Sequence, residues 1–218
     1  MKYIIMCGGT YPKWDHPKQL SLIMGEPIVA RTIRLLRKHG VEDIAISSND
    51  PAFEQFGVPV LHHDNPYVEY EKGIWADGLY PMDEPCCYVF GDVVFSSRAI
   101  KTIVDTPTDD IEFFASAPPF GRGYIKPWVE PFAFKVVNHD HLRKAIKQTR
   151  ELNENMVFSR RPLSWELWQV IKCTPFNKRV ENYTIIRDYT CDVDVPADVE
   201  KFNMFLQQEA RYGNDDTK

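Results

Sequence analysis

The chain has 218 residues, a net charge of −5 and 44% apolar residues. This apolar content excludes a disordered chain, and the length suits one α/β domain, which we place at residues 1–210 with a flexible tail at 211–218. The negative charge argues against nucleic-acid binding. No apolar stretch reaches the ~20 residues that cross a bilayer, and no signal-peptide pattern is present, so we expect a cytoplasmic protein with no membrane partner. The five cysteines lack paired metal-ligand spacing and are expected to be reduced.

The first segment predicts a strand that leads into a phosphate-binding turn. The apolar run 3–7 precedes Gly8 and Gly9, which allow a tight turn and a close approach of the backbone to a ligand. Backbone N–H groups in the turn up to Thr10 can cradle phosphate, and Lys18 adds a cation on a flexible stem. Alone, two glycines after a strand are as often an ordinary turn, and neither familiar glycine-rich phosphate fingerprint is present. The combination predicts a nucleoside triphosphate site.

The next two elements predict a strand–helix–strand unit. Pro27 suits the first helical position, apolar residues recur at helical spacing up to Leu36, and Gly40 is a typical stop. Residues 43–48 then read as a second strand. Units of this kind usually hold their two strands in parallel, with a right-handed crossover.

The middle of the chain predicts a second buried strand that ends in an acid. Residues 85–95 form an apolar run broken by Gly91 and Asp92, which suggests a strand covered on both faces. A carboxylate at such a strand end lies where open α/β sheets bind ligands, and it is costly to bury alone. One suitable partner is Mg²⁺, which prefers one or two carboxylates plus phosphate oxygens. A plain turn after the strand is the alternative.

A second acidic segment lies near the C-terminus. Alternating residues predict a short strand that carries Asp192 and Asp194 on one face. Pro196 then begins a helix with Asp198 near its positive end. Alone, this segment is better explained as a helix-cap region with surface acids. Together with Asp92 and the N-terminal glycines, it is better explained as part of a functional site.

With these segments in place, the chain resembles the nucleotidyltransferases of GT-A-like fold, which join a nucleoside triphosphate to a phosphorylated small molecule or sugar. The family's N-terminal pattern is a strand, a Gly-rich loop with a basic residue, Pro-Lys-x-Leu and a Gly-x-Pro that opens a helix. The matching residues are Gly8, Gly9, Pro17, Lys18, Leu20, Gly25 and Pro27. The resemblance covers most of the chain. It implies a single-domain, Rossmann-like (GT-A-like) three-layer sandwich with a mostly parallel sheet and at least one antiparallel strand after Pro131.

The resemblance also implies roles for individual residues. The Gly-Asp after the family's central strand carries a metal ligand, which maps to Asp92, and the closing motif carries another, which maps to Asp192. Mg²⁺ is the implied cofactor. Lys18 and Lys13 are then catalytic cations, and Lys13 stands where the family commonly has Arg, in a shortened first loop. The implied nucleotide-binding residues are Gly8, Gly9, Thr10, Lys13 and Lys18.

The acceptor side rests on a weaker match. Sugar-phosphate relatives often carry Glu-Lys-Pro before an apolar strand, and Lys126 takes the place of their phosphate-contacting lysine. A surface lysine before a rigid proline explains this residue equally well. Arg160 and Arg161 could meet an anionic substrate, but we interpret them as solvated. The tryptophans of an amphipathic helix over 164–171 are interpreted as core residues. The other candidate acceptor contacts are Trp75, Trp128 and Glu130.

The predicted reaction is nucleotidyl transfer to a phosphorylated small molecule or a sugar 1-phosphate, with release of pyrophosphate. Two alternatives stay open. A GT-A-type glycosyltransferase that uses a nucleotide sugar would want Asp-x-Asp where this chain has Gly91 and Asp92 followed by two valines. A non-catalytic nucleotide-binding protein is compatible with the shortened first loop. The sequence identifies neither the base nor the acceptor, and it leaves a homo-oligomer open.

Overall fold

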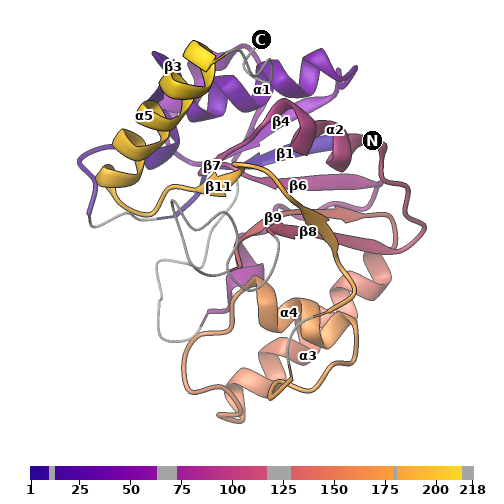
Figure 1. Cartoon of the computed structure of the whole chain (residues 1–218). Helices are drawn as coiled ribbons and strands as arrows, with labels where there is room; N and C mark the ends of the chain where they lie inside the picture. Colours follow the sequence, from indigo (N-terminus) through magenta and orange to yellow (C-terminus); the bar gives the residue numbers. More distant parts are fainter. Residues whose placement is uncertain (10–12, 63–72, 117–128, 179–180, 213–218) are drawn as a thin grey trace.

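A seven-stranded sheet forms the centre of the protein (Figure 1). The computed structural model describes residues 1–9, 13–62, 73–116, 129–178 and 181–212. The strand order is β10-β8-β9-β6-β1-β4-β5, and β9 runs opposite to the other six. The mostly parallel sheet and the antiparallel strand after Pro131 are therefore confirmed. The strands are β1 (Lys2–Met6), β4 (Ile44–Ser47), β5 (Val60–Leu61), β6 (Cys86–Phe90), β8 (Ile111–Ser116), β9 (Pro131–Val136) and β10 (Thr184–Ile186).

Helices cover both faces of this sheet, as the three-layer prediction requires. Helices α1 (Ile28–Lys38) and α2 (Ser97–Asp105) pack on one face. Helices α3 (His139–Glu154) and α4 (Ser164–Ile171) pack on the other, below the sheet in Figure 1. Both tryptophans of α4 join the apolar packing of this second face, as predicted.

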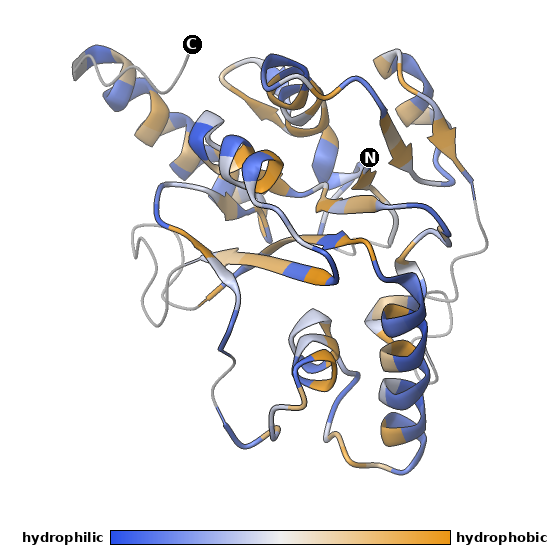
Figure 2. Ribbon diagram, turned by 90° about the vertical axis from the view of Figure 1, so that its right-hand side faces the viewer, coloured by the Kyte–Doolittle hydropathy of each residue, from blue (hydrophilic) through white to orange (hydrophobic). Residues whose placement is uncertain are grey.

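Alternation along β1 shows how the two layers are built. Ile5 packs in the cluster under α1 and α2, whereas Ile4 packs in the cluster under α3 and α4 with Trp168. Strands covered on both faces need such continuous apolar sequences, and Figure 2 shows them in orange between helices with blue outer surfaces. Full burial of one such side chain stabilises the fold by about 1.5–3 kcal/mol.

The predicted strand–helix–strand unit is also confirmed. Pro27 is the N-cap of α1, so its missing N–H costs no helical hydrogen bond, and Gly40 after the helix has a φ of 80°. Strands β1 and β4 pair in parallel, with Ile4 opposite Ala45.

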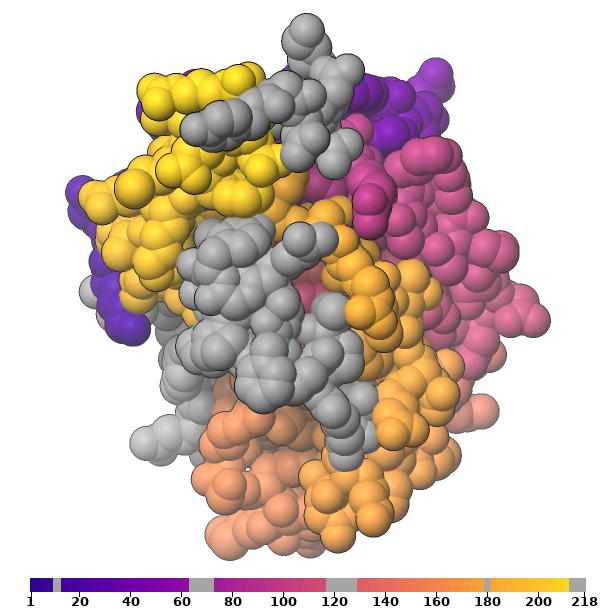
Figure 3. Space-filling view, viewed as in Figure 1, coloured from indigo at the N-terminus to yellow at the C-terminus, as the bar shows by residue number. Residues whose placement is uncertain are grey.

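A third group of elements lies against one end of the sheet. Helix α5 (Pro196–Tyr212) packs on the hairpin of β2 (Leu22–Ile23) and β3 (Glu26–Pro27), and in Figure 3 its yellow surface lies near the indigo N-terminal segment. Asn203 of α5 accepts from Met24 N–H at 2.6 Å and donates to the Leu22 carbonyl at 3.1 Å. Helix α5 continues through Tyr212, two residues into the predicted tail, and residues 213–218 lie outside the described residues.

The short elements complete the description. Strand β7 (Val93–Val94) pairs with β11 (Cys191–Asp192) in a separate two-stranded sheet. The predicted strand over 85–95 is therefore two strands, because the chain leaves the large sheet at Gly91. The 3₁₀ helices are η1 (Lys18–Leu20), η2 (Pro51–Phe56) and η4 (Trp75–Gly78).

Candidate active site

Two adjacent parallel strands, β1 and β6, end at the same edge of the sheet, with Met6 opposite Phe90. The glycine turn follows β1, and Gly9 has a φ of 107°, a conformation that favours glycine. The Gly91–Asp92 turn follows β6. Open α/β sheets bind their ligands at the carboxyl ends of such strands. The two sequence signals thus lie in neighbouring turns.

Gly91 holds these two turns in close contact. Its N–H donates to the Met6 carbonyl at 3.1 Å. A Cβ at this position would lie 2.4 Å from that carbonyl oxygen and 2.8 Å from Cys7 Sγ, so a side chain does not fit. Burial, and secondarily the charge of Asp92, raises the pKa of the Cys7 thiol well above its ordinary value. Cys7 is therefore a packing residue and not a nucleophile.

The pairing of β7 with β11 brings the two predicted metal acids together across one hundred residues of sequence. Asp192 lies opposite Val93, and the Val193 N–H donates to the Asp92 carbonyl at 2.9 Å. The backbones that carry Asp92 and Asp192 are therefore hydrogen-bonded neighbours.

Lys18 inserts its side chain among these acids. Its Nζ lies 2.5 Å from Asp92 Oδ2 and 3.9 Å from Asp194 Oδ1, and the side chain is only 10% exposed. Burial alone would lower the pKa of Lys18. The charge of Asp92 and its hydrogen bond, with the charges of Asp194 and Asp192, outweigh burial and raise the pKa above its ordinary value. The ammonium is therefore charged at neutral pH.

The segment after β11 is fixed by the first loop and by α5. The Trp14 indole N–H donates to the Asp194 carbonyl at 3.3 Å. Asp198 accepts from the N–H groups of Asp194 and Val195, both at 3.1 Å, and pairs with Lys201. Asp198 is thus a capping residue, as the helix-cap interpretation predicts. The sequence analysis missed Trp14; an indole four residues before Lys18 in the first loop was the available signal.

A hydrogen-bond network also anchors the start of β11. Asp188 accepts from the Ser96 hydroxyl at 2.6 Å and from the Thr190 N–H at 2.8 Å, while the Ser96 N–H donates to the Thr190 hydroxyl at 3.0 Å. Ser96 is also the N-cap of α2. The short β7–β11 pair, too small to be stable alone, is in this way tied to a helix.

Two of the predicted acceptor residues, Trp75 and Glu130, lie within the described part of the chain, and Trp75 packs at the end of the strand that leads to Asp92. Its ring packs against Phe90 at 5.2 Å between centroids, and Phe90 ends the strand that leads to Asp92. Arg161 donates to the Ile74 carbonyl at 2.8 Å. The interpretation of Arg161 as solvated was wrong, because this partly buried guanidinium supports the backbone before Trp75.

The remaining predicted residues are more scattered. Glu130 is buried where β9 begins, and its backbone exchanges hydrogen bonds with Ser116 at the end of β8. Lys13 is exposed, in contrast to Lys18. The predicted contacts Thr10, Lys126 and Trp128 lie outside the described residues.

The donor chemistry of this cluster fits a magnesium ion. Asp92 and Asp192 are neighbours, Asp194 is close, and the Lys18 ammonium lies among these acids. Within the described part of the chain, no group of three potential side-chain ligands is arranged around one point. A site with few protein ligands suits Mg²⁺, which completes its coordination with water and substrate phosphates.

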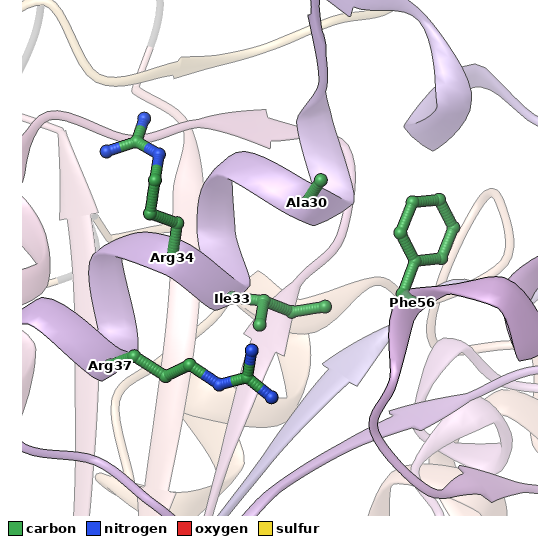
Figure 4. A pocket seen from close by; sticks show the side chains of 5 residues that line it. All are labelled: Ala30, Ile33, Arg34, Arg37 and Phe56. Carbon is green, nitrogen blue, oxygen red and sulfur yellow. The ribbon is translucent and has the colours of Figure 1, made fainter.

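A separate hollow of about 240 Å³ lies between α1 and Phe56 at the end of η2 (Figure 4). Within it, Arg34 forms a bidentate pair with Glu26 at 2.9 and 2.7 Å. The acid cluster contributes no residue to this hollow, so it is not part of the candidate active site. Its lining residues are Ala30, Ile33, Arg34, Arg37 and Phe56.

Comparisons with known proteins agree with the fold. The MobA-like NTP transferase domain family matches residues 3–162, a stretch that includes the glycine turn, Lys18 and Asp92. Curated proteins yielded no significant match. None of the described helices combines the length and apolarity needed to cross a membrane.

Two solved structures are similar in fold. The inositol-1-phosphate CTP transferase from T. maritima superposes with a TM-score of 0.56 at 16% identity, over 92% of this chain and 94% of that one. HddC from Yersinia pseudotuberculosis complexed with GMP-PN superposes with a TM-score of 0.54 at 14% identity, over 94% and 99% of the two chains.

Proposed function

The chain belongs to the MobA-like NTP transferase domain family, and we propose on this premise that it transfers a nucleoside monophosphate from a triphosphate to a phosphorylated small molecule or a sugar 1-phosphate. The observation that carries the proposal is the Lys18 ammonium, 2.5 Å from Asp92, beside the backbone pair that joins Asp92 to Asp192. This cluster lies at the carboxyl ends of β1 and β6, where the fold binds ligands.

The proposed reaction is an in-line displacement at phosphorus. An oxygen of the acceptor's phosphate forms a bond to the α-phosphorus, the bond from that phosphorus to the bridging oxygen breaks, and pyrophosphate leaves with the electron pair. The acceptor phosphate is already ionised at neutral pH, so no general base is required. Such a transfer depends on positioning and on neutralising charge. Lys18 would stabilise charge on the phosphates, with help from the N–H groups of Gly8 and Gly9.

Asp92 and Asp192 would hold a magnesium ion in this site. The bound ion would neutralise charge on the phosphate oxygens. Thr10 and Lys13 would contact the triphosphate from the first loop. The acceptor would lie on the side of Trp75 and Glu130, with Lys126 on its phosphate and Trp128 nearby. Because one structural neighbour is an inositol-1-phosphate CTP transferase, CTP with a polyol or sugar phosphate is the first pair to test. We place the reaction in the cytoplasm.

The test is to incubate the purified protein with each of four nucleoside triphosphates, Mg²⁺ and pooled phosphorylated metabolites. We expect pyrophosphate together with a conjugate whose mass is that of the acceptor plus a nucleoside monophosphate, and no product when EDTA is present. Triphosphate binding with no pyrophosphate across the panel would instead favour a nucleotide-binding protein. Release of a nucleoside diphosphate from a nucleotide sugar would favour a glycosyltransferase.

A matched pair of variants assigns any activity to the site. Asp92→Asn is expected to remove it, whereas Asp105→Asn is expected to retain it. Asp105 is an exposed acid that pairs with Lys101 within α2. Equal activity in the two variants would contradict the role of Asp92.

A further inference from the structure

In this structure, the acid cluster holds the ammonium of Lys18. Its ammonium lies 2.5 Å from Asp92 and 3.9 Å from Asp194, and the charge of Asp192 also acts on it. Its backbone is fixed in η1, where the Lys18 carbonyl accepts from the Ser21 N–H at 3.1 Å. The cation comes from the first loop, whereas the acids come from the turn after β6 and from the segment around β11.

A divalent cation on Asp92 would compete with this ammonium. Magnesium binds carboxylate oxygens at about 2.0–2.1 Å. Such an ion would therefore lie close to an ammonium that itself lies 2.5 Å from the same carboxylate. Like charges so close together repel strongly where water is largely excluded, and the Lys18 side chain is only 10% exposed. Lys18 in this position opposes the binding of a bare divalent cation.

A triphosphate removes this conflict. Its oxygens offer the ammonium another anionic partner, and the flexible four-carbon stem lets the Lys18 head group move while η1 stays in place. The added negative charge also favours a second cation in the same cluster.

We propose that Lys18 is a built-in counter-ion, which keeps bare divalent cations off Asp92 and Asp192 and yields to a cation that arrives with a triphosphate. This inference deepens the proposed function and rests on it for the identity of the anion. The two ligands then bind cooperatively, because each favours the same displacement of Lys18.

The test is the affinity of the protein for Mn²⁺ alone, measured from the paramagnetic resonance signal of the free ion. We expect Lys18→Met to bind Mn²⁺ about tenfold or more tightly than the wild type. Lys18→Gln provides a second neutral side chain if the Met variant does not fold. In thermal unfolding, Mn²⁺ alone should raise the midpoint of the Lys18 variants. The wild-type midpoint should rise clearly only with Mn²⁺ and tripolyphosphate together.

The matched control is Lys201→Met, which removes an ammonium paired with Asp198 at 3.1 Å, outside the proposed metal pair. It should bind Mn²⁺ as the wild type does, and adding Asp92→Asn to Lys18→Met should abolish the gain. Lys18 variants that bind Mn²⁺ no more tightly than the wild type would overturn the counter-ion role, even if the wild type releases pyrophosphate. A gain in Mn²⁺ affinity without any pyrophosphate release would support the counter-ion role and overturn the proposed function.

Discussion

Two buried lysines in different regions of the molecule have opposite surroundings. Lys18, in the first loop, meets the carboxylate of Asp92. Lys135, on β9, donates to the carbonyls of Val104 at 3.0 Å and Thr106 at 2.7 Å, where α2 ends. Burial lowers the pKa of Lys135, whereas the charge of Asp92 raises the pKa of Lys18 against the same effect of burial.

We infer from this difference that Lys135 has a structural role and Lys18 a functional one. Backbone carbonyls at a helix C-terminus are permanent partners, so Lys135 closes α2 and has no reason to move. Carboxylates at a strand end can exchange one cation for another, so Lys18 occupies a place that a ligand can take. In our proposal, the same residue type stabilises the fold in one region and holds the place of a ligand in the other.

The largest expected effect comes from removing the partner of Lys18. Asp92→Asn keeps the shape of the side chain but removes the charge, and loss of one preorganised charge interaction commonly costs about 10²–10³-fold in rate. We expect at least about a 100-fold loss of kcat/KM in pyrophosphate release. Circular dichroism should show an unchanged fold, since Asp194 still faces Lys18. If Asp92→Asn released pyrophosphate at the wild-type rate, the charge of Asp92 would have no role in the reaction.

Gly91→Ala tests the packing beneath that charge. The new Cβ would meet the Met6 carbonyl oxygen at 2.4 Å, and this backbone atom cannot move without distorting β1. Overpacking of this kind costs about 1–3 kcal/mol, which urea denaturation can measure. Activity should fall as well, because Asp92 is displaced. Unchanged stability would mean that the two turns are not in the close contact described here.

Lys135→Met tests the structural member of the pair. It leaves the carbonyls of Val104 and Thr106 without their buried donor, at a cost of about 1–3 kcal/mol in the free energy of unfolding. We expect kcat/KM to stay at the wild-type value. If Lys135→Met lost activity at unchanged stability, the assignment of a structural role to Lys135 would be contradicted.

The smallest expected effect is in alkaline stability, where the two lysines act with opposite sign. The pKa of Lys18 is raised on folding, so its contribution is present below the ordinary value of 10.5 and is lost as pH rises through the folded-state pKa. The pKa of Lys135 is lowered, so folding becomes more favourable as pH rises from that lower pKa toward 10.5. Unfolding free energies should be measured between about pH 8 and pH 12. Lys18→Met should reduce the loss of stability above pH 10.5, and Lys135→Met should remove the gain of stability below it. If the two substitutions changed the pH dependence of stability in the same direction, the opposite pKa shifts of the two lysines would be contradicted.

Much of the fold could be predicted from the sequence because its signals are local. Apolar runs, Pro27 and Gly40 predicted β1, α1 and β4, and the amphipathic pattern over 164–171 predicted α4. Such patterns report the burial of neighbouring residues and need no knowledge of distant partners.

The site could be predicted only in part, because its parts meet through long-range contacts. The resemblance named Asp92 and Asp192, and alternation predicted the short strand at Asp192. The pairing of β7 with β11, which brings the two acids together, is a long-range contact that no periodicity reveals. The ion pair of Lys18 with Asp92 was missed because the sequence analysis assigned that lysine to phosphate alone. Arg161 was also misjudged, because its partner, the backbone carbonyl of Ile74, is far away in the sequence.

The most direct test is the position of Mn²⁺ in crystals grown with Mn²⁺ and CTP, located by anomalous scattering. The account predicts a peak within coordination distance of both Asp92 and Asp192, with the Lys18 ammonium moved from Asp92 onto a phosphate oxygen. A peak away from these two acids, or Lys18 still paired with Asp92 beside a bound triphosphate, would contradict it.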